Sequence, residues 1–160
     1  MRTARALLPF LGAILLSLAP PAAAGATPSA PVTLSDHIVF GPVNQGTFTA
    51  TAPLCPSGTL TGEAKAVGGA FVGGDTTRFT ATTVDHFTCA DGSGTFTIQF
   101  HPQGDVAALR GGPTPWVVLG GTGAYSAMHG AGDFFYALTS SPAQGLVEGF
   151  ETFTGEVHFD

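Results

Sequence analysis

The chain has 160 residues, of which only 10% are charged, and its formal net charge is −6. The scarcity of cations excludes nucleic acid as an expected partner, because phosphate binding needs a basic footprint. Glycine and proline are abundant, but the Thr/Phe/Val/Ile alternations between them argue against disorder, which is poor in aromatic and β-branched residues.

The N-terminus has the features of a secretory signal peptide. Arg2 and Arg5 give a positive start, residues 6–19 form an apolar run, and residues 22–24 (Ala-Ala-Ala) form a small-residue cleavage site. The apolar run is shorter than the roughly 20 residues that a transmembrane helix needs. We therefore expect a signal peptide over 1–24, a flexible leader over 25–33 and one domain over 34–160 of a secreted protein without membrane association after cleavage. Removing Arg2 and Arg5 brings the net charge near −8.

The rest of the chain is predicted to form strands. In chain order we expect them at 35–40, 47–52, 58–67, 77–89, 94–101, 116–119, 131–138 and 146–159, the last with a break at Gly155 as an open alternative. The segment 102–115 is expected to be a loop, with 106–110 as a candidate extra strand. Phe96, Ile98 and Phe100 alternate cleanly with polar residues, which is typical of a half-buried strand. Eight strands with short connections and no amphipathic helix predict an all-β antiparallel barrel or sandwich.

Cys55 and Cys89 are the only cysteines, so an exported chain is expected to join them in a disulfide, with a pair of buried thiols as the alternative. The loop-entropy model gives this bond roughly 3 to 4.5 kcal/mol. A hairpin centred on Val72 would place Cys55 directly opposite Cys89. That register leaves open whether the face of Leu60 or the face of Phe87 points inward, and a β-bulge in the fourth strand would reconcile the two.

A glycine-rich stretch carries a family resemblance. Residues 120–130 (Gly-Gly-Thr-Gly-Ala-Tyr-Ser-Ala-Met-His-Gly) resemble the corner of the dirigent and allene oxide cyclase barrel superfamily. Residues 88–96 are similar to a run in small secreted bacterial proteins with such barrels. The resemblance implies an eight-stranded antiparallel, calycin-like or dirigent-like barrel around an apolar cavity, and it leaves a homo-oligomer open. It marks as structural corner residues Gly120, Gly121, Thr122, Gly123, Tyr125 and Gly130.

Two acidic residues are the candidates for chemistry, although no catalytic residue can be carried over from the family. Glu151 shares the apolar strand phase of Phe153 and Val157. An inward carboxylate needs a shifted pKa, a hydrogen-bond donor or a wet cavity. A position at the barrel rim or at a local bulge is the simpler explanation. Asp85 is the second candidate.

Aromatic side chains are the candidates for lining a ligand cavity. An eight-stranded barrel has an interior that side chains fill or that holds one small ligand. The same rings could therefore line a cavity or fill it. These residues are Phe96, Phe100, Trp116, Phe134, Tyr136 and Phe153.

No cofactor or metal site is expected. The five histidines are scattered without metal-ligand spacing, and neither a nucleophile elbow nor a phosphate loop occurs. We predict a secreted barrel that binds a small hydrophobic ligand in its interior without catalysis. The first alternative is a dirigent-like or cyclase-like enzyme that guides cyclisation or coupling of a hydrophobic substrate, with Glu151 or Asp85 stabilising a cation or moving a proton. The second is an extracellular structural or inhibitor-like protein with a filled barrel.

Overall fold

Strands make up most of the chain that the computed structural model describes, which comprises residues 27–40, 43–69, 78–105, 109–139 and 147–160. The predicted signal peptide, 1–24, lies outside these residues. Among the described residues, no helix is long and apolar enough to span a membrane. The strands are β1 (Ala30–Phe40), β2 (Asn44–Ala50), β3 (Ser57–Gly69), β4 (Arg78–Cys89), β5 (Gly94–Phe100), β6 (Gln103–Asp105), β7 (Arg110–Gly123), β8 (Met128–Leu138) and β9 (Val147–Phe159).

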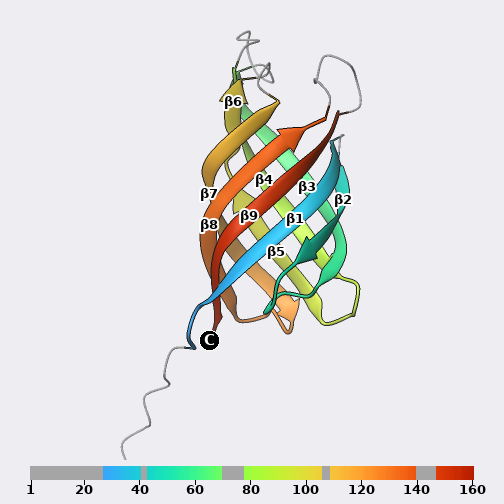
Figure 1. Ribbon diagram of the computed structural model, residues 1–160, viewed down its shortest axis with the longest axis vertical. Coiled ribbons are helices and arrows are strands. Elements are labelled where there is room, and N and C mark those ends of the chain that lie inside the picture. Colours follow the sequence, from blue (N-terminus) through green and yellow to red (C-terminus); the bar gives the residue numbers. More distant parts are fainter. Residues whose placement is uncertain (1–26, 41–42, 70–77, 106–108, 140–146) are drawn as a thin grey trace, which may run out of the picture.

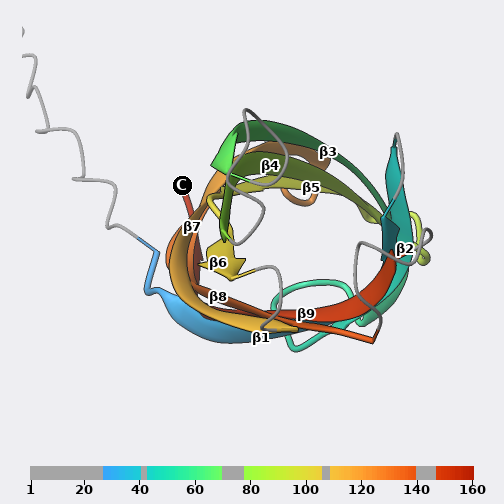
Figure 2. The ribbon, with the colours of Figure 1, turned by 90° about the horizontal axis from the view of Figure 1, so that it is seen from above.

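Eight of these strands close into an antiparallel barrel, as the sequence predicts, and β6 is an extra strand. The order around the sheet is β3-β2-β1-β9-β8-β7-β5-β4, and the pairing of β3 with β4 closes the ring (Figures 1 and 2). We call the end where β1 finishes and β9 begins the upper end, as in Figure 1. The lower end holds the turns between β4 and β5 and between β7 and β8.

Several strands differ in extent from the predictions. β1 begins at Ala30, inside the segment expected to be a flexible leader, because residues 30–33 pair with β9. The short extra strand is β6, which pairs with β4. Of the candidate extra strand at 106–110, residues 106–108 lie outside the described residues, and Arg110 is the first residue of β7. β9 is continuous through Gly155, which pairs with Gly132 of β8. The absence of side chains at that pair leaves room for the Trp116 ring, whose Cζ2 lies 2.7 Å from where a Cβ on Gly155 would be.

The glycine-rich corner is mostly strand. Gly120, Gly121 and Gly123 belong to the end of β7, and the turn itself comprises residues 124–127. Gly123 has φ of +60°, a conformation that suits glycine. Tyr125 and Met128 are buried, and the Tyr125 ring lies 5.3 Å from that of Phe96 and 6.4 Å from that of Phe159 between centroids.

The predicted disulfide is present, but the predicted hairpin register is wrong. Cys55 and Cys89 are bonded with Cα atoms 5.9 Å apart. The residue opposite Cys89 is Gly58, and Cys55 precedes the start of β3. The correct register pairs Leu60 with Phe87, so both point inward. The irregularity lies in β3, between Ala66 and Gly68, rather than in the fourth strand.

Aromatic rings fill much of the barrel interior. Phe87 and Phe96 stack with centroids 4.9 Å apart, and Phe48 meets both edge-on. Phe153 of β9 extends this packing across the barrel, because its ring centroid lies 6.1 Å from that of Phe87 on β4. The interior around these rings therefore belongs to the hydrophobic core and forms a base for the residues nearer the upper end.

Candidate functional site

Three acidic side chains lie inside the barrel. Asp36 of β1 and Glu151 of β9 are each 3% exposed, and Asp85 of β4 is 0% exposed. Glu151 lies at neither a rim nor a bulge, because β9 keeps an unbroken register with β1 and with β8. The three acids therefore occupy strand positions whose side chains point into the barrel. We call these three residues the carboxyl cluster.

Strand register brings the cluster together from two sides of the barrel. Asp36 pairs directly with Glu151, which pairs in turn with Tyr136 of β8. Asp85 pairs with Gly62 of β3. All three side chains face the barrel interior, where the charge of Asp85 raises the pKa of both Asp36 and Glu151.

Gly62 makes room for one member of the cluster. A Cβ atom at this position would lie 1.9 Å from Oδ1 of Asp85. The Asp85 carboxyl group therefore rests against the bare backbone of β3. A glycine inside a strand often marks such a close approach.

Most of the carboxyl oxygens of the cluster have no hydrogen bond among the described residues. Both oxygens of Asp36, both of Asp85 and Oε2 of Glu151 are closed off from solvent and have no hydrogen bond in the described part of the chain. The cationic side chains that the structure describes are exposed or half-exposed on the barrel: Lys65, Arg110 and the histidines 37, 86, 101, 129 and 158. An ionised carboxylate in such surroundings is costly because nothing replaces its water.

The environment shifts all three groups toward the protonated form. Burial raises the pKa of Asp36 from 3.8 to about 8, and repulsion from Asp85 adds to the rise. The backbone of Glu151 opposes this increase, although no hydrogen bond of good geometry joins it to Asp36. Burial raises the pKa of Asp85 to about 7. Burial, followed by repulsion from Asp36 and Asp85, raises the pKa of Glu151 well above 4.5.

A buried hydroxyl faces the same interior. Thr114 of β7 is 3% exposed, and its Oγ1 has no hydrogen bond in the described part of the chain. It pairs with Phe134, which lies two residues before Tyr136 on the inward face of β8. Tyr136 itself pairs with Glu151. Thr114 thus adds a neutral donor and acceptor on the side of the barrel where Glu151 lies.

The aromatic residues predicted to line a cavity are all buried, and their rings pack against one another. Phe134 meets Phe100 at 4.2 Å and Phe153 at 5.0 Å between ring centroids. Trp116 meets Phe153 edge-on at 6.3 Å, and its Nε1 donates to the Thr154 carbonyl. Phe96 lies deeper, against the lower-end residue Tyr125 at 5.3 Å.

The sequence prediction missed Asp36 and Thr114. Asp36 carries the same signal as Glu151, because it follows Val32 and Leu34 in the apolar phase of β1. The predicted strand begins at residue 35, so it leaves out Val32 and Leu34, the apolar residues that show the alternation. Thr114 fell in a predicted loop, where no alternation was expected.

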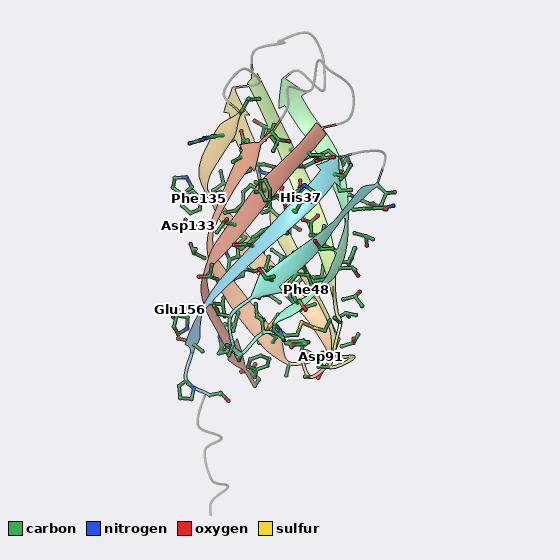
Figure 3. All side chains as sticks on the ribbon, turned by 45° about the vertical axis from the view of Figure 1, so that its right-hand side comes forward. His37, Phe48, Asp91, Asp133, Phe135 and Glu156 are labelled. Carbon is green, nitrogen blue, oxygen red and sulfur yellow. A yellow bond between two sulfur atoms is a disulfide. The ribbon has the colours of Figure 1, made fainter. Side chains whose placement is uncertain are left out.

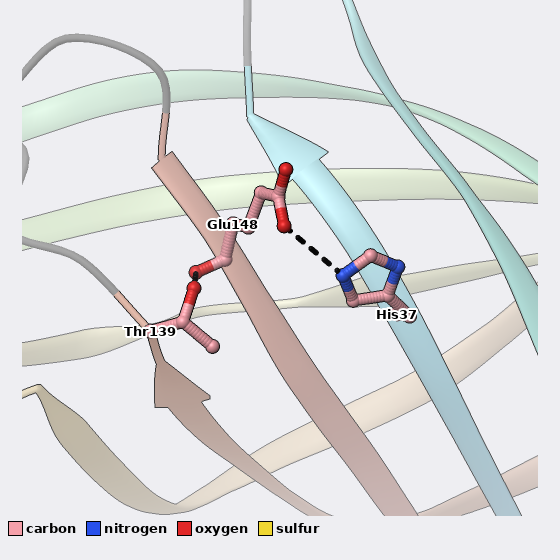
Figure 4. A network of polar contacts seen from close by, with 3 residues as sticks. All are labelled: His37, Thr139 and Glu148. Carbon is pink, nitrogen blue, oxygen red and sulfur yellow. Dashed lines mark hydrogen bonds and ion pairs between the residues drawn. The ribbon is translucent and has the colours of Figure 1, made fainter.

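The polar contacts described on the outside of the barrel are separate from the cluster. Nε2 of His37 lies 3.5 Å from Oε2 of Glu148, whose carbonyl accepts from the hydroxyl of Thr139 at 2.9 Å (Figure 4). Both ionic side chains are almost half exposed. Within the described residues, no group of three or more His, Cys, Asp or Glu side chains is arranged to hold a metal ion.

Comparisons of the chain with protein-family models, curated proteins and solved structures find no match.

Proposed function

We propose that this protein is an exported barrel that binds a small, largely apolar molecule between its aromatic core and its upper end, without catalysis. The observation that carries the proposal is the carboxyl cluster: three buried acidic side chains, five of whose six carboxyl oxygens have no hydrogen bond among the described residues. Well-packed apolar residues would stabilise a barrel as well or better, because buried charge is often a net cost. Such costly groups in a concave setting are typical of functional sites.

The position of the cluster supports a ligand with an apolar body. Asp85 and Glu151 each lie two residues from an inward phenylalanine, Phe87 and Phe153 respectively, on the upper side of that ring. A bound molecule would therefore have its polar group beside the acids and its apolar part against rings. The closed packing of the carboxyl oxygens means that a ligand must displace neighbouring side chains to reach them.

Export is part of the proposal. The features of residues 1–24 are those of a secretory signal, and the Cys55–Cys89 disulfide is the kind of bond that persists in oxidising compartments. The resemblance of residues 120–130 to dirigent-like barrels is consistent with an interior binding function.

Native mass spectrometry of the mature protein, purified from its own host before and after organic extraction, tests this function. We expect a small molecule at stoichiometric level that extraction removes. Adding it back should change the fluorescence of Trp116, the only tryptophan, which is buried against Phe153. A ligand-free mass together with no binding of apolar probes would instead favour a filled structural barrel.

A catalytic function is the second candidate, because two members of the cluster have pKa values near neutrality. Asp85 at about 7 and Asp36 at about 8 would allow one carboxylate and one carboxylic acid to coexist, which suits general acid–base chemistry. Incubation of the co-purified molecule with the protein in D2O distinguishes the two functions. Deuterium incorporation or turnover that Asp85→Asn abolishes would establish an enzyme, whereas an unchanged molecule would leave a binding protein.

A further inference from the structure

The charge balance of the interior indicates which class of molecule the barrel binds. Asp36, Asp85 and Glu151 repel one another, and the described cationic side chains are on the exposed surface. Three carboxyl groups in a dry space cannot all ionise unless a positive charge joins them. The fold thus provides acidic groups whose charge a ligand could balance.

An independent feature, the Thr114 hydroxyl, also lacks a partner. It is buried, belongs to a different strand from the acids and has no hydrogen bond among the described residues. A hydroxyl can donate and accept, so it can complete the hydrogen bonding of a ligand that the carboxyl groups hold by charge. An ammonium group has three donors and would use such an additional acceptor.

The neighbouring rings favour an organic cation over a metal ion. Phe87, Phe100, Phe134 and Phe153 form a connected group through ring contacts. The negative faces of aromatic rings attract cations, and their area favours an apolar body. The described acidic side chains do not form a group suited to a metal ion.

We propose that the ligand is an organic cation, a protonated amine on a compact apolar or aromatic body, whose ammonium group lies among Asp36, Asp85 and Glu151. This inference rests on the proposed binding function and specifies its ligand. Binding exchanges charge for charge: the ammonium enters, a carboxylic acid of the cluster ionises, and its proton leaves to solvent. The net charge of the mature chain, near −8, would also attract cations.

Proton exchange makes the affinity depend on pH. Among the side chains that the structure describes, the buried titratable groups on the strands around the cluster are its own members and Tyr136 of β8. The inward residues of β2, β3, β5 and β7 near this level are Asn44, Gly62, Ile98, Phe100 and Thr114, which do not titrate. At pH 5 the carboxyl groups of Asp36 and Asp85 hold their protons and resist the amine, whereas near pH 8 these two groups give up their protons readily. The protein would take up its ligand in neutral medium and release it in acid.

A matched pair of probes tests the inference on the mature, disulfide-bonded protein: 2-phenylethylamine and the neutral 2-phenylethanol. We expect Trp116 fluorescence and calorimetry at pH 8 to show about ten-fold or tighter binding of the amine. Its affinity should fall at least about ten-fold at pH 5. Calorimetry in buffers of different ionisation enthalpy should show release of about one proton per amine bound.

Charge-removing variants locate the site. Glu151→Gln and Asp36→Asn should weaken amine binding by about ten-fold or more and leave binding of the alcohol unchanged. The matched controls are Glu156→Gln and Asp133→Asn, because both acids are exposed on the outside of the barrel (Figure 3). The controls should bind the amine as the parent does. Near-ultraviolet circular dichroism confirms that each variant is folded.

The outcomes separate this inference from the proposed function. Equal binding of alcohol and amine, or amine binding that Glu151→Gln leaves unchanged, would overturn the cationic ligand while a binding barrel stands. If neither probe binds, the co-purified molecule decides: an amine supports the inference and a neutral or acidic molecule overturns it. No bound molecule of any kind overturns both.

Discussion

At the scale of single residues, the interior of this barrel departs from the rule that inward strand positions are apolar. Asp36, Asp85 and Glu151 occupy positions that a stable core would give to valine or leucine. None of the cationic side chains that the structure describes is buried beside these acids, and at one position a glycine makes room for the acid. That glycine is Gly62, which lies against Asp85.

We expect Gly62→Ala to destabilise the protein by about 1 to 3 kcal/mol, because the new methyl group would overlap Oδ1 of Asp85. Urea denaturation measures the loss. A double-mutant cycle with Asp85→Ala tests the cause, since removal of the carboxyl group should recover most of the cost. Strictly additive costs for the two substitutions would mean that the Asp85 contact is not responsible.

At the scale of elements, cross-strand pairing explains the high threonine content. Thr47, Thr59, Thr88, Thr95 and Thr122 form one row across β2, β3, β4, β5 and β7. Their β-branched side chains suit the half-exposed outer surface of a sheet. The hydroxyl groups of Thr95 and Thr122 are also hydrogen-bonded to each other at 2.8 Å. Such pairs contribute roughly 0.2 to 1 kcal/mol each and help to hold this register.

The disulfide stabilises the hairpin of β3 and β4 at its lower end. Its two cysteines are 34 residues apart, so opening it should cost about 3 to 4.5 kcal/mol by the loop-entropy model. We expect Cys55→Ser combined with Cys89→Ser to lower the melting temperature by about 10 °C or more at pH 6, with an unchanged strand signal in far-ultraviolet circular dichroism. Two free thiols in the purified exported protein, detected by alkylation, would show that the bond is not formed in the cell.

At the scale of the whole molecule, the cluster links folding to pH. The pKa values of Asp85 and Asp36 are about 7 and about 8 in the folded protein and roughly 3.9 in an unfolded chain. Between about pH 4 and pH 8 the folded protein therefore binds more protons than the unfolded chain does. The contribution of these two groups to the free energy of unfolding is fully present below about pH 4 and is lost as the pH rises toward 8.

We expect the melting temperature to be at least about 5 °C lower at pH 9 than at pH 5, since 1 kcal/mol corresponds to about 3 to 5 °C in a domain of this size. Scanning calorimetry across this range measures the slope. Asp36→Asn should make the fall of melting temperature with pH less steep, because an amide does not titrate. The exposed control Asp133→Asn should keep the slope of the parent protein. A parent slope of zero, or one of opposite sign, would contradict the raised pKa values.

Period-two alternation and cysteine count are local or compositional signals, so the sequence alone was enough to predict the all-β class, eight barrel strands and the Cys55–Cys89 pairing, but not the full extents of β1 and β7. It also marked Glu151 as an acid in an apolar phase. The pairing of Leu60 with Phe87 on the inner face, and the placing of Asp36, Asp85 and Glu151 in one interior, became visible only in the folded barrel. Alternation defines two faces within a strand, but barrel closure and register decide which face is inside and which residues of distant strands are neighbours.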